Sequence, residues 1–187
     1  KNNHVDFYSK SIKFGLGAAV IGGLLVSGAG HFQGQTVAKL QPMKVAAFEA
    51  LWETHDPAPF AIVAGIDQDG KKNNFEIGVP GALSFVVHDS FKGEVKGIND
   101  LQKEAELKHG AGDYVPHVTS MFWSFRVMIL AGILMLVTSI VGYYLHMKGK
   151  LLNNKAALKA IYHMLALPFI ANSTGWYVAE AGRQPWL

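Results

Sequence analysis

Three long apolar segments, separated by polar stretches, dominate the chain. Residues 12–29 and 118–145 are nearly unbroken nonpolar runs, and residues 160–180 form a third run that contains Pro168. No residue from Val127 to Leu145 is charged, which meets the roughly 20 residues that a helix needs to cross a bilayer. Proline lacks a backbone N–H, so we expect a kink in the third helix. The pattern predicts an all-α integral membrane protein with three transmembrane helices of a larger helical bundle.

The first apolar segment is rich in glycine and has two interpretations. The pairs Ala18/Gly22 and Gly23/Ser27 have small-xxx-small spacing, which lets helices approach closely in lipid. A signal peptide is the alternative, because lysines precede the run and Ser27-Gly-Ala29 resembles a cleavage site. The two later apolar segments and the start at Lys1 rather than Met favour a transmembrane helix. We expect this sequence to be a piece of a longer polypeptide.

Residues 30–117 form a polar region between the first two apolar segments. Turn-forming sequences divide it at Asp56-Pro-Ala-Pro59, Asp67-Gln-Asp-Gly70, Gly78-Val-Pro-Gly81 and Gly110-Ala-Gly112. We expect an extramembrane loop with an interfacial helix over residues 42–53. Pro42 is suited to the first turn of that helix, and Val45, Phe48 and Trp52 would share its apolar face.

The lysines predict how the segments are oriented. They precede the first apolar segment and fill the connector at residues 146–159, which has no acidic residue. The positive-inside rule places both regions in the cytoplasm. Residues 30–117 and residues 181–187, which contain Gly182-Arg-Gln-Pro-Trp186, then lie outside. Because the net charge is only +3, we interpret the lysines as orientation signals rather than as a nucleic-acid surface.

The absence of cysteine limits the possible redox chemistry. It excludes disulfides, thiolate-bound iron–sulfur clusters and covalent c-type haem. Any redox cofactor must be held non-covalently by histidine, methionine or carboxylate side chains. There is also no His-x-x-x-His metal pair and no P-loop. We interpret His31 and His163 as interfacial hydrogen-bonding residues rather than ligands.

Four features combine apolar surroundings with polar chemistry. Trp176, Glu180 and Arg183 fall within about 60° on a helix, although an interfacial tryptophan with a terminal salt bridge would have the same spacing. Met121, Met128 and Met135 form a stripe that serves either packing or haem ligation.

Arg126 enters the second apolar segment, where an arginine is paired, lines a site or extends outward to water. Lys44 and Glu49 are a titratable pair about 140° apart on one helix, or solvated surface charges.

Three segments together resemble subunit I of cytochrome bd ubiquinol oxidase. They are Gln41-Pro-Met-Lys-Val-Ala-Ala-Phe-Glu-Ala-Leu-Trp-Glu-Thr54, Phe125-Arg-Val-Met128 and Gly175-Trp-Tyr-Val-Ala-Glu-Ala-Gly-Arg-Gln-Pro-Trp186. The resemblance covers nearly the whole chain but only the middle of the family's subunit, without its N-terminal helices and its last helix. It implies a bacterial cytoplasmic-membrane enzyme that oxidises quinol at the outer face and reduces O2 to water. Such an enzyme generates proton motive force without pumping.

The resemblance also implies cofactors and partners. The cofactors are a low-spin haem b, a high-spin haem b, and haem d or a further haem b. The partners are the remaining helices of the subunit with their haem-ligating histidines, a second oxidase subunit, small accessory subunits, membrane lipid, ubiquinol or menaquinol, and O2. Residues 30–117 would be the quinol-binding loop, called the Q-loop. Its shortness leaves the quinone type open.

Individual residues take roles from the same resemblance. Met128 matches the axial ligand of the low-spin haem b, and Arg126 matches the arginine beside it. Lys44 and Glu49 match the pair tied to quinol oxidation. Glu180 matches a carboxylate that ligates a high-spin haem, and Trp176 and Arg183 match residues that line the same haem region. The competing hypotheses are a non-catalytic quinone-binding membrane anchor and a transporter segment, in which Pro168 would break a helix that lines a substrate path.

Overall fold

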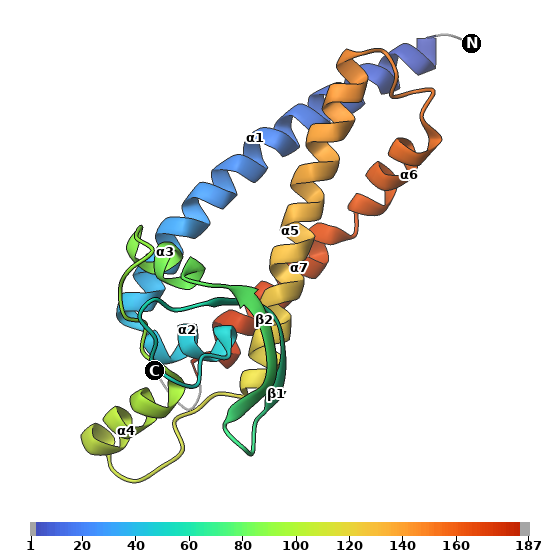
Figure 1. Cartoon of the computed structure of the whole chain (residues 1–187). Helices are drawn as coiled ribbons and strands as arrows, with labels where there is room; N and C mark the ends of the chain where they lie inside the picture. Colours follow the sequence, from blue (N-terminus) through green and yellow to red (C-terminus); the bar gives the residue numbers. More distant parts are fainter. Residues whose placement is uncertain (1–2, 184–187) are drawn as a thin grey trace. The chain divides into compact units, whose positions relative to one another are not determined.

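The computed structural model describes residues 3–183, which belong to two compact units. The helical unit comprises Lys1–Ala29 and Val127–Ser173, and the loop unit comprises Gly30–Arg126 and Thr174–Leu187. Figure 1 labels the elements along the chain. In order they are α1 (Asn3–Leu40), α2 (Pro42–Glu49), β1 (Phe60–Asp67), β2 (Lys72–Val79), α3 (Ala82–His88), α4 (Ile98–His109), α5 (Val118–Met147), α6 (Lys155–Met164) and α7 (Leu167–Ala181).

The two longest apolar segments form the two longest helices. Within the described residues, α1 and α5 are long and apolar enough to cross a membrane. The helix expected over residues 118–145 extends to Met147, and the helix expected over residues 12–29 extends from Asn3 to Leu40. Many of their large apolar side chains are exposed, as expected of helices that face lipid or further helices.

Glycine brings α1 and α5 together in the helical unit. A Cβ added at Gly23 would lie 2.9 Å from Leu136 Cδ1, whereas one added at Gly22 would meet no atom within 4 Å. Gly17 and Gly142 also face bulky side chains, Tyr143 and Leu16 among them. Of the two small-residue pairs in the sequence, the one that contains Gly23 therefore lies at this helix contact.

The third apolar segment is two helices rather than the single kinked helix expected over residues 160–180. Helix α6 ends at Met164, and α7 begins at Leu167. Pro168 lies in the first turn of α7, where a missing N–H costs nothing because those donors have no partner within the helix. The proline therefore acts at a helix start, after an interruption at Leu165 and Ala166. A third membrane crossing stays a prediction.

The described residues are mainly helical, as expected of an all-α chain, but β1 and β2 add an antiparallel hairpin that the sequence did not predict. Phe60 pairs with Val79 at its open end, and Asp67 pairs with Lys72 at the turn. The turn coincides with the predicted Asp67-Gln-Asp-Gly70 sequence, in which the Gly70 N–H donates a 2.8 Å hydrogen bond to Asp67 Oδ1. The predicted turn is confirmed, whereas its flanks, which were expected to be part of an extramembrane loop, are strands.

The interfacial helix predicted over residues 42–53 is shorter than expected. Helix α2 ends at Glu49 because Ala50 adopts a left-handed conformation with φ 51°. Trp52 therefore leaves the helix, and its side chain enters the core, where Nε1 donates a 3.0 Å hydrogen bond to Asn73 Oδ1. Most of α2 is buried, so α2 is an internal helix of the loop unit rather than an amphipathic surface helix.

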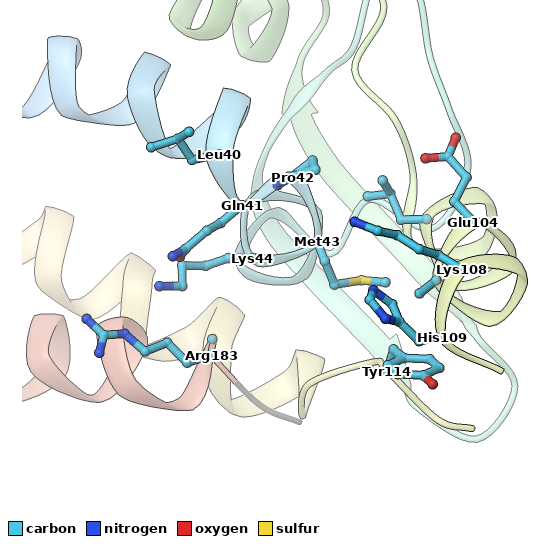
Figure 2. Close-up of a pocket in the computed structure, with 13 residues that line it drawn as sticks. Leu40, Gln41, Pro42, Met43, Lys44, Glu104, Lys108, His109, Tyr114 and Arg183 are labelled. Carbon is cyan, nitrogen blue, oxygen red and sulfur yellow. The ribbon is translucent and has the colours of Figure 1, made fainter. Parts of the chain in front are cut away.

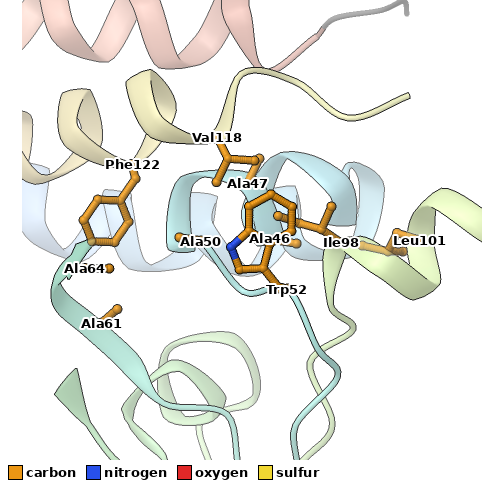
Figure 3. Close-up of a cluster of buried hydrophobic side chains, with 10 residues drawn as sticks. All are labelled: Ala46, Ala47, Ala50, Trp52, Ala61, Ala64, Ile98, Leu101, Val118 and Phe122. Carbon is orange, nitrogen blue, oxygen red and sulfur yellow. The ribbon is translucent and has the colours of Figure 1, made fainter. Parts of the chain in front are cut away.

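Small side chains let α2 pack closely in the core of the loop unit. Figure 3 shows alanines of α2 and β1 beside larger side chains from the rest of the unit. The buried cluster consists of Ala46, Ala47, Ala50, Trp52, Ala61, Ala64, Ile98, Leu101, Val118 and Phe122. This packing fixes α2, and with it the two titratable residues that the helix carries.

Candidate functional site

Lys44 is directed toward the C-terminal end of α7. Its Nζ donates a 3.1 Å hydrogen bond to the Ala179 carbonyl oxygen, and the residue is 8% exposed. Gly182 leaves room for it, since a Cβ there would lie 2.7 Å from Lys44 Cε. Burial and the positive charge of Arg183 lower the pKa of Lys44, and Glu180 opposes them. Lys44 is thus a buried donor whose protonation is influenced by the charges of Glu180 and Arg183, two residues of the predicted site.

Glu49 is directed to a different partner, Arg126. Arg126 Nη2 donates a 2.6 Å hydrogen bond to Glu49 Oε2, and its Nε donates a 2.7 Å bond to the Ala61 carbonyl oxygen. The guanidinium carbon lies 4.4 Å from the ring centroids of both Phe60 and Phe122. Both charged side chains are nearly inaccessible, at 9% exposure for Arg126 and 2% for Glu49. The arginine expected to be paired or at a site is therefore paired, by a residue 77 positions earlier.

Burial controls the protonation of Glu49. Loss of hydration raises its pKa to about 7, although the charge of Arg126 and its hydrogen bond act in the opposite direction. Glu76 adds a smaller repulsion that also raises the pKa. Glu49 is therefore able to exchange a proton near neutral pH.

A cavity of about 670 Å³ opens beside Lys44 in the loop unit. Its volume lies within the roughly 300–1,000 Å³ typical of small-molecule sites. Figure 2 shows Lys44 and Arg183 among the side chains that line it, together with Met43, His109 and Tyr114. Glu49 is not among the lining residues, as the 140° separation predicted from helix geometry would suggest.

Helix α4 supplies a wall of this cavity that the sequence did not predict. The charges of residues 103–108 are typical of a solvated helix face, and no local spacing connects them to α2. His109 and Tyr114 lie more than 60 residues from Lys44 in the sequence, so only the fold brings them to one cavity.

The predicted cluster at the C-terminal end lies partly on α7. Trp176 is 69% exposed, and Glu180 is also exposed, with a carboxylate that forms no hydrogen bond with another described residue. Helix α7 ends at Ala181, so Arg183 lies beyond the helix rather than on its face, and its N–H donates a 3.1 Å bond to the Glu180 carbonyl oxygen. The rest of the predicted outer segment, residues 184–187, lies outside the described residues.

The remaining candidates lie on α1 and α5. Met128 is half-buried, and Met121 is fully buried. His31 Nε2 lies 2.7 Å from Asp89 Oδ1, which fits its interpretation as a hydrogen-bonding residue. Among residues 3–183 no three histidine, cysteine or acidic side chains converge as a metal site. A single thioether or carboxylate ligand, as expected for haem, does not require such a cluster.

Known proteins resemble this chain over its whole length. The family model for cytochrome bd terminal oxidase subunit I matches residues 1–187. Cytochrome bd ubiquinol oxidase subunit 1 of Bacillus subtilis (strain 168) is 42% identical over 187 residues, which are 100% of this chain and 40% of the relative. Cytochrome bd-II ubiquinol oxidase subunit 1 of Escherichia coli (strain K12) is 28% identical, over 90% of this chain and 43% of the relative.

A solved structure agrees with these relatives. The bd oxidase of Geobacillus thermodenitrificans matches 99% of this chain and 40% of its own chain, with a TM-score of 0.77 and 26% identity. The chain thus spans about two fifths of the length of the relatives that it matches. On the whole-chain family match and the 42% identity, the chain belongs to the cytochrome bd terminal oxidase subunit I family.

Proposed function

We propose that this chain is part of the haem-bearing catalytic subunit of a respiratory terminal oxidase. The oxidase takes electrons from quinol at the outer membrane face and reduces O2 to water, generating proton motive force without pumping. Family membership supports this function, and so do the curated relatives, whose names describe ubiquinol oxidases. The observation that carries the proposal is the cavity beside Lys44, which is of suitable size for a quinol head group.

Lys44 and Glu49 have different roles in this proposal. The Lys44 ammonium group lines the cavity and donates a hydrogen bond to one quinol oxygen. Glu49 is required for quinol oxidation but does not line the cavity. Its influence passes through Arg126, whose charge it balances from within the core.

The haem ligands in this proposal lie on α5 and α7. Met128 would supply an axial thioether to a low-spin haem b, near which Arg126 lies. Glu180 would supply a carboxylate to a high-spin haem b, or to haem d or a further haem b, with Trp176 and Arg183 lining the same region. The residues fit this role because the Glu180 carboxylate has no hydrogen bond to another described residue, and the Trp176 ring is exposed. Bound haem supplies one-electron redox chemistry and O2 reduction.

The partners are those needed to complete such sites. They are the remaining helices of the subunit with their histidine ligands, a second oxidase subunit, small accessory subunits, lipid, ubiquinol or menaquinol, and O2. The exposed apolar side chains of α1 and α5 support a place in a larger helical bundle of the bacterial cytoplasmic membrane, with the Q-loop on the outer side.

The test is a reduced-minus-oxidised visible spectrum of the intact complex, combined with quinol-driven O2 uptake. A low-spin b signal and quinol oxidation would support the proposal, and a red-shifted chlorin band would add haem d. Protohaem bands alone would indicate a further haem b instead. A folded complex without a haem signal would contradict the proposal and favour a quinone-binding anchor.

Replacing Lys44 with glutamine should lower kcat/KM for quinol at least tenfold in the intact complex, because a charge-assisted hydrogen bond contributes about 1.5–3 kcal/mol. The measurement is quinol-dependent O2 uptake. Lys103→Gln is the matched control, since the Lys103 side chain is 72% exposed and does not line the cavity. Equal turnover in both variants would remove Lys44 from the quinol site.

Replacing Met128 with leucine should abolish the low-spin haem signal while the high-spin bands persist, because leucine retains the volume but not the thioether ligand. The measurement is the reduced-minus-oxidised spectrum. Met135→Leu, on the same stripe of α5, is the control and should leave the spectrum unchanged. An intact low-spin signal in the Met128 variant would contradict the ligand assignment.

A further inference from the structure

Oxidation of quinol in the Lys44 cavity requires a proton acceptor that reaches the cavity. The buried Glu49 carboxylate does not line it, and its Oε2 is held 2.6 Å from Arg126 Nη2. A base must lie within hydrogen-bond reach of the proton that it removes. A different residue should therefore take the proton directly from the bound quinol.

Among the described residues that line the cavity, one is a suitable base. Lys44, Lys108 and Arg183 are donors, and Glu104 is held 2.6 Å from Lys96 Nζ in an ion pair. His109 is the remaining group that accepts a proton through a neutral nitrogen. Its ring forms no hydrogen bond with another described residue, so a nitrogen is available to a ligand.

The position of His109 suits a ring-shaped substrate. His109 is the last residue of α4, and its ring centroid lies 6.1 Å from that of Tyr114. Tyr114 is fixed, since its hydroxyl donates a 3.1 Å hydrogen bond to the Gly110 carbonyl oxygen and its N–H donates a 2.9 Å bond to Gln102 Oε1. Figure 2 shows His109 and Tyr114 beside Met43, which gives the cavity an aromatic and thioether wall. His109 is also exposed, so a proton that it accepts can pass to water.

We propose that His109 is the residue that accepts a proton directly from quinol bound in the Lys44 cavity, with Tyr114 packing against the quinol ring. This inference rests on the proposed quinol oxidation. The O–H bond facing His109 breaks, and its proton goes to the imidazole and then to water. The proton of the second O–H group leaves through the open side of the cavity. Bound haem would supply the one-electron acceptor for the two electrons, so that quinol becomes quinone.

The experiment measures quinol oxidation by the intact oxidase carrying His109→Gln or His109→Ala. Glutamine keeps hydrogen-bonding capacity but cannot accept a proton at neutral pH. We expect kcat to fall at least tenfold in both variants, with KM changed less than threefold, because general base catalysis contributes about 10²–10⁴-fold. Added imidazole should restore turnover in the alanine variant but not in the glutamine variant, whose side chain fills the space. His55→Gln, at an exposed histidine outside this cavity, should leave kcat unchanged.

Two further measurements distinguish an error in the His109 assignment from an error in the proposed quinol oxidation. An artificial one-electron donor that bypasses quinol should drive O2 uptake equally in wild type and variants, and their haem spectra should match, which shows that the variants assemble. If the wild type oxidises quinol and the His109 variants retain kcat within twofold, the His109 assignment is wrong and the proposed function stands. If the wild type uses the artificial donor but no quinol, the proposed quinol oxidation fails, and the His109 assignment fails with it.

Discussion

Replacing Glu49 with alanine should lower the free energy of unfolding of the loop unit by about 3–5 kcal/mol, because removal of one partner leaves the other charge buried and unpaired. Arg126 is only 9% exposed and would keep only the Ala61 carbonyl as an acceptor among its described partners. The measurement is the thermal midpoint and the inactivation half-life of the intact complex.

Glutamine at the same position is the matched control. Glu49→Gln keeps an oxygen that accepts a hydrogen bond from Arg126 and keeps the side-chain volume, so it should cost much less than alanine. Equal thermal midpoints for the two variants would contradict this prediction, because the oxygen that glutamine retains would then contribute nothing to stability. Both variants should oxidise quinol more slowly than the wild type if Glu49 is required for turnover.

The same residue should give the complex a characteristic dependence of stability on pH. Burial raises the pKa of Glu49 from an ordinary 4.5 to about 7, so the folded protein holds this proton more tightly than the unfolded chain. The stabilisation is complete below pH 4.5 and is lost as the pH rises to about 7, by on the order of 3 kcal/mol. Subtracting the pH profile of Glu49→Gln from that of the wild type isolates this contribution. A difference that rises with pH over this window would contradict the assignment.

Replacing Gly97 with alanine should prevent the loop unit from folding as described. A Cβ at this position would lie 2.6 Å from the backbone oxygens of both Trp52 and Glu53. These backbones cannot easily move, because the Ile98 N–H donates a 2.8 Å hydrogen bond to the Leu51 carbonyl oxygen and the Asn99 N–H donates a 3.0 Å bond to that of Trp52. We expect a loss of about 3 kcal/mol or more, the upper part of the range for overpacked sites. The measurement is the yield of haem-loaded complex in membranes.

Gly30→Ala is the control for this prediction. Gly30 lies within α1, and a Cβ there meets no atom within 4 Å. Alanine is a better helix former than glycine by up to about 1 kcal/mol, so this variant should assemble at least as well as the wild type. A normal yield from Gly97→Ala would show that the contact between the α4 start and residues 52–53 is looser than described.

The long apolar runs predicted the long helices, because length and apolarity are properties of contiguous residues. The run at residues 118–145 matches α5 to within two residues. The prediction for α2 was too long, because the helix ends where Ala50 adopts a left-handed conformation. Alanine is an ordinary helix former, so the sequence does not indicate this end. The strands were not predicted, because buried and exposed residues do not alternate regularly along β1 and most residues of β2 are exposed on both faces.

The sequence identified individual residues of the candidate site but not how they pair in the folded chain. The sequence identified Lys44, Glu49 and Arg126 as unusual, but the Glu49–Arg126 pair joins positions 77 residues apart, and no spacing rule connects them. Helix geometry did predict that Lys44 and Glu49 point in different directions. The sequence did not identify His109 as a site residue, because its proposed role depends on the cavity that α2 and α4 line only in the folded chain.

The break between α6 and α7 has a consequence for membrane thickness. Helix α7 has 15 residues and is about 22 Å long, which is shorter than a hydrocarbon core of about 30 Å. Helix α5 has 30 residues, or about 45 Å, and easily exceeds that core. In the predicted third membrane crossing by α7, the two helices would have opposite hydrophobic mismatch, which a bilayer accommodates by thinning around one and by tilt of the other. The residues near Glu180 should therefore respond to acyl-chain length more strongly than those on α5.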